Sequence, residues 1–193
     1  MDTAQIRCTL QNVKSFLGVF PSDLLPNSIS RSGSVTINTD PHTEKGSHWL
    51  AIHFEPKSSS AYYFDSYGIL PIIPTIRDFL ERNCTVWYYN DTQLQGLTST
   101  VCGHYCCIFA LHMDRGFTPK QFVGLFNTKI ADMQINKVFT REFGPLRTET
   151  RGGQCSFSIY KRYVPNYNLF IFNFNCNPNG GGHRLRILEG DRG

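Results

Sequence analysis

The segment 94–109 constrains this chain most, because it places a cysteine at the start of a helix. Residues Cys102 to Met113 are apolar and predict that helix. Cys102 would lie in its first turn, where unsatisfied backbone N–H groups and the helix dipole favour a thiolate. A thiol nucleophile also needs a base and a group that orients the base, and His48 and Asp65 stand upstream. A fold that uses these groups must bring distant segments together.

Two predicted strands carry the histidine and the aspartate. Residues 48–54 and 61–67 are rich in aromatic and branched side chains, and a serine-rich turn joins them. If they pair as an antiparallel hairpin, His48 and Asp65 can lie directly opposite each other. A two-residue shift makes them diagonal neighbours on the same face, whereas a one-residue shift places them on opposite faces. The predicted contact therefore depends on the register of the hairpin.

The chemistry gives each of these residues a role. His48 would act as the base toward the sulfur of Cys102, and Asp65 would accept a hydrogen bond from the other ring nitrogen and so fix the tautomer. A buried carboxylate is costly unless it is paired, which favours this contact. Gln95 would present its side-chain amide to a developing oxyanion, beside the backbone N–H of Cys102.

Two neighbours complete the predicted site. Trp49 would shield the imidazole or line the substrate cleft, and Gly103 would leave room for a substrate carbonyl. Each residue of the site also has a purely structural interpretation. A cysteine at the start of an apolar helix is often a packing residue, and a partly buried histidine often only satisfies a backbone group.

The other predicted elements surround these segments. Ile6, Leu10, Val13 and Leu17 have helical spacing and predict a helix over residues 3–18. A loop rich in proline, serine and glycine follows over 21–33. The remaining expectations are a strand at 35–38, a helix at 72–83, a strand at 86–89, the end of the cysteine-rich helix at Gly116, and a further helix from Thr118-Pro119 through Phe126.

Three stretches taken together resemble the adenovirus endopeptidase (adenain) family, cysteine proteases of the same broad clan as the ubiquitin-like-protein proteases. In that family a catalytic histidine is followed directly by a tryptophan, and an acidic residue stands 17 positions after the histidine. A glutamine stands seven positions before the catalytic cysteine. His48 to Asp65 and Gln95 to Cys102 reproduce these spacings. Asp is usual at the acidic position in the ubiquitin-like-protein proteases and Glu in adenoviruses. The matching stretches are Gly46–Ala51, Tyr63–Gly68, and Gln95-Gly96 with Cys102-Gly103 and Cys106-Cys107.

The resemblance, which extends more loosely over about residues 16–143, implies a fold and an activity. The implied fold class is α+β, with a central mixed sheet packed by helices and the nucleophile at the N-terminus of a central helix. The implied activity is that of a cysteine endopeptidase that cleaves near glycine in precursor, capsid-type proteins and requires no cofactor for its chemistry. An alternative is a protease that removes a ubiquitin-like modifier. The source would be an adenovirus-like virus or a self-synthesising DNA transposon.

The resemblance also implies regulators of such an enzyme. Cys84 falls where the family has a cysteine that forms a disulfide with an activating peptide, so a cysteine-containing peptide is an expected partner. Cys84 would lie exposed beside a sheet edge that accepts an added strand. DNA is the other expected stimulator, and it would bind through basic residues.

Charge and composition bound the remaining possibilities. A chain of 193 residues fits one domain that buries roughly two-thirds of its unfolded surface. The net charge of +4 lies beyond residue 140, because residues 1–140 hold 11 basic and 11 acidic residues. The resemblance ends at about residue 143, so it implies a protease domain over 1–143, followed by a basic extension over 144–193 that we expect to be partly ordered at best. A DNA-binding role for this extension competes with an ordinary solvated basic surface.

The cysteines and the apolar runs predict the compartment. No apolar run approaches the ~20 residues of a membrane span, and the first residues lack the features of a signal peptide. Seven cysteines, an odd number, are expected to be reduced thiols. These features predict an intracellular protein that is not secreted and does not bind membranes, nuclear or virion-associated if it is virus-like.

Two other classes of function fit parts of the sequence. Cys102 and Cys106 lie one helical turn apart, with His104, Cys107 and His112 nearby, which permits a zinc site. The absence of a Cys-x-x-Cys knuckle argues against it, and no metal is expected. A non-enzymatic nucleic-acid-binding or structural protein would use the basic extension alone. Selective labelling of Cys102 by a thiol-reactive probe would distinguish an enzyme from such a protein.

Overall fold

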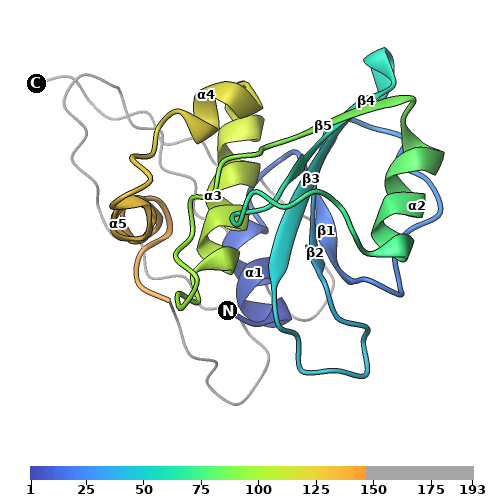
Figure 1. The fold of residues 1–193 in the computed structure, drawn as a ribbon. Coiled ribbons are helices and arrows are strands. Elements are labelled where there is room, and N and C mark those ends of the chain that lie inside the picture. Colours follow the sequence, from blue (N-terminus) through green and yellow to red (C-terminus); the bar gives the residue numbers. More distant parts are fainter. Residues whose placement is uncertain (147–193) are drawn as a thin grey trace, which may run out of the picture. The chain divides into compact units, whose positions relative to one another are not determined.

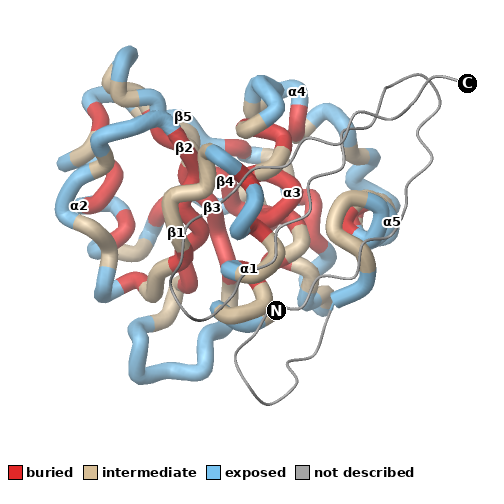
Figure 2. The backbone as a smooth tube through the Cα atoms, turned by 180° about the vertical axis from the view of Figure 1, so that it is seen from behind, coloured by how far each residue is buried: buried red, intermediate tan, exposed pale blue. Residues whose placement is uncertain are grey.

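A buried helix, α3 (Cys102–Asp114), stands at the centre of this computed structural model, which describes residues 1–146. Ten of its 13 residues are buried, as expected for a helix that is apolar around its whole circumference. Figure 1 shows α3 against one face of a sheet, and Figure 2 shows its backbone among the buried parts of the chain. The helix predicted from Cys102 to Met113 is thus confirmed.

The remaining elements form a mixed sheet with helices on both faces, which confirms the predicted α+β class. The strand order is β1-β2-β3-β4-β5; the outer pairs β1/β2 and β4/β5 are parallel, and the two inner pairs are antiparallel. The elements are α1 (Thr3–Leu10), β1 (Phe16–Pro21), β2 (Gly33–Asn38), β3 (Trp49–Glu55), the 3-10 turn η1 (Pro56–Ser58), β4 (Ser60–Phe64), α2 (Pro74–Asn83), β5 (Val86–Tyr89), α3, α4 (Pro119–Val123) and α5 (Ala131–Phe143).

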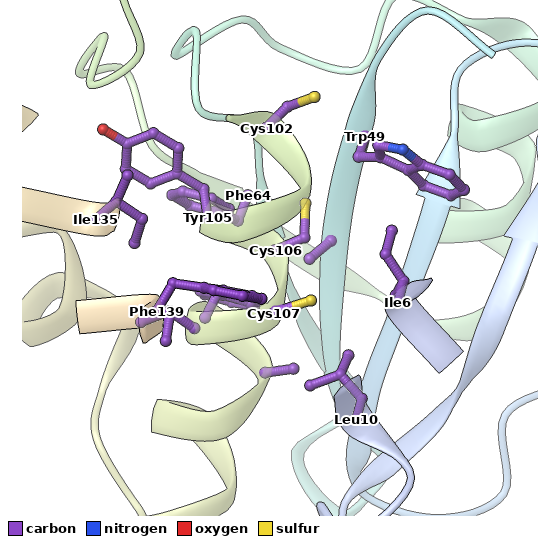
Figure 3. Close-up of a cluster of buried hydrophobic side chains, with 14 of the residues drawn as sticks. Ile6, Leu10, Trp49, Phe64, Cys102, Tyr105, Cys106, Cys107, Ile135 and Phe139 are labelled. Atoms are coloured by element: carbon purple, nitrogen blue, oxygen red, sulfur yellow. The ribbon is translucent and has the colours of Figure 1, made fainter. Parts of the chain in front are cut away.

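The sheet separates two hydrophobic cores. Alternate side chains of a strand point to opposite faces, so Ala51 and Phe64 face α3 whereas Ile52 and Tyr63 face α2. The core on the first face joins α1, α3, α4 and α5 to the sheet. Figure 3 shows how α1 and α5 contact α3 from different sides, with Leu10 on one and Phe139 on the other.

The N-terminal helix is shorter than predicted, because its second half belongs to the sheet. α1 ends at Leu10, and β1 starts at Phe16 and pairs with β2, where a helix had been expected through residue 18. Ile6 and Leu10 pack in the core with α3, whereas Leu17 packs on the opposite face of the sheet. Strand pairing therefore overrides the helical spacing of the apolar residues. Isolated helices of this length are marginal, so tertiary packing decides where such a helix ends.

Two further differences concern the C-terminal part of the described chain. The helix expected from Pro119 through Phe126 ends at Val123, and Leu125 is largely exposed beyond it. The helix α5 was not predicted. It buries Ala131, Ile135 and Phe139 at spacings of four, which is a helical period that sequence reasoning missed.

The register of the β3–β4 hairpin decides the predicted contact between His48 and Asp65. Ala51 pairs with Phe64 and Ile52 with Tyr63. A continuation of this register past the strand ends places Tyr67 opposite His48, with Asp65 two residues away on the same face. This is the two-residue shift, the arrangement that makes the histidine and the aspartate diagonal neighbours.

Several expectations concern cysteines, membranes and the C-terminal extension. Cys8 is disulfide-bonded, so the expectation of reduced thiols is wrong at this position, whereas Cys84, Cys102, Cys106 and Cys107 are free.

Among residues 1–146, no helix is long and apolar enough to cross a membrane. The basic extension over 144–193 lies almost entirely outside the described residues, so its predicted boundary and DNA binding stay predictions.

Replacing Phe64 with alanine should destabilise the fold strongly. Its ring is fully buried, stacks on Phe109 at 4.9 Å and meets the edge of Phe122 at 5.2 Å. We expect a loss of about 3–5 kcal/mol in the free energy of unfolding, measured by urea denaturation. The control Leu97→Ala removes a side chain that is 82% exposed and should change stability by less than about 0.5 kcal/mol. Equal unfolding midpoints for the two variants would contradict this core.

Candidate active site

The N-terminus of α3 presents Cys102 to the site. Cys102 is the first residue of the helix, and no side chain caps the N-terminal amides, because Val101 stands at the capping position. These amides and the positive end of the helix dipole therefore remain available to an anion. The thiol is mostly buried and packs in the core with the sheet and α1. In Figure 3 the Cys102 sulfur lies at the top of α3, on the side of Trp49.

His48 and Asp65 meet across the end of the β3–β4 hairpin. His48 directly precedes β3, and Asp65 directly follows β4. The Nε2 atom of His48 lies 2.8 Å from Oδ1 of Asp65, and both side chains are largely shielded from solvent. The predicted contact between these residues is therefore confirmed. The other ring nitrogen, Nδ1, is left for the sulfur.

The surroundings of the site shift the pKa values of His48 and Cys102. Burial by itself lowers the pKa of His48, but the hydrogen bonds to Asp65 and Cys102 outweigh it and raise the pKa to about 9. Burial raises the pKa of Cys102, but the hydrogen bond with His48, the backbone N–H of Trp49 and the charge of His48 bring it below its ordinary value. Each charged form therefore stabilises the other, which favours a thiolate–imidazolium pair.

Asn90 holds Asp65 in place, and the sequence did not reveal this residue. Its Oδ1 accepts a hydrogen bond from the backbone N–H of Asp65 at 3.0 Å, and its Nδ2 donates to the Asp65 carbonyl at 2.6 Å. Asn90 is buried directly after β5, next to β4 in the sheet. A buried amide needs hydrogen-bond partners, so an asparagine directly after an aromatic strand could have indicated a residue that holds a neighbouring segment.

Gln95 is buried in a hydrogen-bond network of its own. Its Oε1 accepts from the hydroxyl of Ser66 at 2.7 Å. Its Nε2 donates to the carbonyl of Ser99 at 2.6 Å and to the hydroxyl of Tyr67 at 3.2 Å. Both hydrogens of the amide are thus engaged within the protein. The predicted donation from Gln95 to an oxyanion stays a prediction and would require one of these bonds to break.

A carboxylate on α5 anchors the loop that carries Gln95. Asp132 accepts from the backbone N–H of Gly96 at 3.0 Å and from the hydroxyl of Tyr105 at 3.1 Å. Tyr105 belongs to α3, so a single side chain joins the loop, α3 and α5. The sequence did not single out Asp132, because the helix on which it stands was not predicted.

Trp49 and Gly103 contact the N-terminal residue of the chain. The Nε1 atom of Trp49 donates to the carbonyl of Met1 at 2.8 Å, and the Trp49 side chain is buried in the core. A Cβ atom at Gly103 would lie only 3.0 Å from the Met1 side chain. A side chain at position 103 would therefore require Met1 to move slightly. Lining of a substrate cleft by either residue stays a prediction.

Cys84 is not exposed, contrary to expectation. It caps the C-terminus of α2, is only 7% exposed, and donates its thiol hydrogen to the carbonyl of Leu80 at 3.2 Å. Burial raises its pKa, which disfavours the reactive thiolate. The adjacent strand β5 is an edge of the sheet and exposes Val86 and Tyr88. Within residues 1–146 no further strand pairs with β5 on that side, whereas Cys84 belongs to the core.

The other cysteines of α3 are core residues. Cys106 and Cys107 are fully buried, and burial raises the pKa of both thiols. Figure 3 shows Cys106 one turn below Cys102 and Cys107 beyond it. Within residues 1–146, no group of three or more His, Cys, Asp or Glu side chains is arranged to hold a metal ion.

Comparisons with known proteins identify relatives of the chain. A family model described as adenovirus endoprotease matches residues 16–71, which include His48 and Asp65. The protease of human adenovirus B serotype 3 is 27% identical over 152 residues, covering 65% of this chain and 71% of that protein. The protease of bovine adenovirus B serotype 3 is 29% identical over 151 residues, covering 65% of this chain and 73% of that protein.

The chain is similar to the adenovirus proteases. This likeness supports a cysteine peptidase. A crystal structure of an ASFV protease has the same fold, with a TM-score of 0.56 at 19% identity, covering 74% of this chain and 66% of that chain. At this identity the likeness concerns the fold alone, and it agrees with the α+β class described above.

The reactivity of Cys102 should depend on His48 and on pH. In the wild-type protein, the half-maximum of Cys102 alkylation by iodoacetamide should lie below the ordinary pKa of a cysteine thiol, because the protonated His48 lowers the pKa of Cys102. His48→Ala removes that cause and leaves burial, which raises the pKa of Cys102. We expect alkylation near neutral pH to slow by about tenfold for each unit by which the pKa of Cys102 rises. Mass spectrometry of the labelled peptide measures the rate. An unchanged pH profile in His48→Ala would contradict the ion pair.

Proposed function

We propose that this protein is a cysteine endopeptidase that uses Cys102 as nucleophile and His48 as general base and acid. The observation that carries the proposal is the geometry of three groups from distant segments. Cys102 begins a buried helix, and His48 lowers the pKa of its thiol. The ring of His48 is hydrogen-bonded to Asp65 at 2.8 Å. The similarity to adenovirus proteases supports the choice of a peptide bond as substrate.

The proposed reaction follows from the charges. The Cys102 thiolate attacks the carbonyl carbon of the scissile bond, and the electron pair of the C=O bond moves to the oxygen. Collapse of this intermediate breaks the C–N bond, and the His48 imidazolium gives its proton to the leaving amine. Water, deprotonated by His48, then hydrolyses the thioester and restores the free thiol. Asp65 orients the ring and stabilises its charged form throughout.

The proposed substrates are proteins cut near glycine, and this rests on the likeness to the adenovirus proteases. Small residues let an extended chain enter a narrow site. By the same likeness, we propose precursor proteins of a virus-like particle as natural substrates, in a nuclear or virion-associated setting. Mass-spectrometric mapping of cleavage in a peptide library tests this preference. Cleavage of only folded ubiquitin-like conjugates would instead favour the deconjugating alternative.

Loss of either partner of the ion pair should abolish cleavage. Cys102→Ala removes the nucleophile, and His48→Ala removes the base, so each should reduce kcat/KM to a few per cent of the wild-type value or less. Asp65→Asn should be milder than His48→Ala, because the imidazole remains. The matched control His42→Ala changes an exposed histidine that pairs with Asp23 and should leave cleavage unchanged. Retention of substantial activity by Cys102→Ala would rule out the mechanism.

Regulation by a peptide or by DNA is a separate part of the proposal. The exposed edge of β5 supports strand addition by a peptide, whereas the burial of Cys84 requires local opening before a disulfide forms. We expect a cysteine-containing activating peptide to raise activity and to form a mixed disulfide that Cys84→Ser removes, detected by intact mass. Full activity without any peptide, together with an unreactive Cys84, would exclude this regulation. DNA binding is assigned to the basic extension, beyond the described residues.

A further inference from the structure

One residue contacts both elements that carry the reacting groups. The carbonyl oxygen of Met1 accepts a hydrogen bond of 2.8 Å from Nε1 of Trp49, which follows His48 at the start of β3. The side chain of Met1 packs against Gly103, which follows Cys102 at the start of α3. A Cβ atom at Gly103 would lie 3.0 Å from Cβ and 3.2 Å from Sδ of Met1. Met1 therefore bridges the immediate neighbours of the proposed base and of the proposed nucleophile.

The start of α1 fixes the position of Met1. Asp2 caps this helix: its Oδ1 accepts from the backbone N–H of Gln5 at 2.8 Å, and Oε1 of Gln5 accepts from the backbone N–H of Asp2 at 2.9 Å. Met1 and Ile6 occupy the two positions that form a hydrophobic staple around such a cap, and both pack in the core that contains α3. Figure 3 shows Ile6 below Trp49 in this core. The chain at Met1 is therefore held by packing as well as by its hydrogen bond to Trp49.

Both residues that Met1 contacts donate backbone hydrogen bonds to the sulfur of Cys102. Burial raises the pKa of Cys102, and the hydrogen bond with His48 is the strongest of the effects that lower it. Hydrogen bonds from the backbone N–H groups of Trp49 and Gly103 lower it further. Such bonds weaken steeply as their geometry departs from the optimum. A small displacement of β3 relative to α3 would therefore weaken the stabilisation of the thiolate.

We propose that Met1 is a positioning residue that holds the backbone N–H groups of Trp49 and Gly103 against the sulfur of Cys102. The Met1 carbonyl fixes Trp49 through the indole, because a buried indole N–H needs an acceptor. The Met1 side chain supports the first turn of α3 at Gly103. This inference rests on the proposed function for its effect on cleavage, whereas the state of the thiol is measured without a substrate.

Two variants each remove one of the contacts of Met1. Trp49→Phe keeps an aromatic ring and the backbone N–H but removes the indole donor. Met1→Ala removes the side chain and keeps the carbonyl. It is made by cleaving an N-terminal fusion directly before residue 1, and the wild type is prepared in the same way. We expect the half-maximum of Cys102 alkylation by iodoacetamide to move to higher pH in both variants. A rise of about half a unit in the pKa would slow alkylation near neutral pH by about threefold.

The pH profile separates positioning from simple packing. Both variants leave His48, Tyr67 and Cys106, the other titratable groups that interact with Cys102, unchanged. At high pH, where the thiol is ionised in every variant, alkylation should therefore reach the wild-type rate. At neutral pH, kcat/KM for a peptide should fall by the same factor as the alkylation rate, because both follow the fraction of thiolate.

A conservative variant and two matched controls complete the experiment. Met1→Leu replaces the side chain with one of similar volume and should restore the wild-type profile. Met133→Ala alters a half-exposed methionine of α5, and Trp87→Phe alters a partly buried tryptophan of β5 on the opposite face of the sheet. Neither control should move the pH profile of Cys102 alkylation.

The outcomes separate this inference from the proposed function. Wild-type pH profiles in both Trp49→Phe and Met1→Ala would overturn the role of Met1, even if urea denaturation showed lower stability, because Met1 would then only be a packing residue. A loss of kcat/KM with an unchanged alkylation profile would also overturn it. Shifted profiles in both variants of a protein that cleaves no peptide would reject the peptidase and leave the positioning role of Met1 standing.

Discussion

The hydrogen bond between His48 and Asp65 is the contact on which the rest of the site depends. It exists because the β3–β4 hairpin has a register that makes the two residues diagonal neighbours just beyond the strand ends. A slip of one residue would send them to opposite faces of the sheet. The bond in turn raises the pKa of His48, and the protonated His48 lowers the pKa of Cys102 at the start of α3. Strand register is thereby linked to the charge state of a thiol on another element.

Burying such charges is costly, and the surrounding polar groups offset that cost by holding each partner in place. Asn90 fixes the backbone of Asp65, and Asp132 fixes the loop of Gln95 to α3 and α5. Their hydrogen bonds go to the backbone of Asp65 and Thr92, to the backbone of Gly96 and to Tyr105. They decide whether the donors and acceptors of the site are in position before a substrate arrives, which is the basis of electrostatic stabilisation in enzymes.

The sequence was sufficient where local pattern and chemistry agree. The helix of Cys102, both hairpin strands and β5 follow from apolar periodicity and residue type. The need of a buried carboxylate for a partner favoured the contact of His48 with Asp65, but the hairpin register that permits it was fixed only by the structure. It was insufficient where tertiary pairing overrides periodicity, as at Leu17, which joins β1 rather than a helix. The sequence also did not predict the supporting roles of Asn90 and Asp132 or the internal hydrogen bonds of the Gln95 amide. The partners of such side chains are set by the three-dimensional arrangement of loops. The burial of Cys84 was missed for the same reason.

Titration of the His48 imidazole by NMR tests the central claim most directly. In the wild-type protein the ring should stay protonated through neutral pH and lose its proton at about pH 9, because Asp65 and the Cys102 thiolate both stabilise the charge. In Cys102→Ala and in Asp65→Asn, each of which removes one of these partners, the transition should move to lower pH. A wild-type His48 that is already neutral at neutral pH, with the same titration in both variants, would contradict the ion pair and the mechanism built on it.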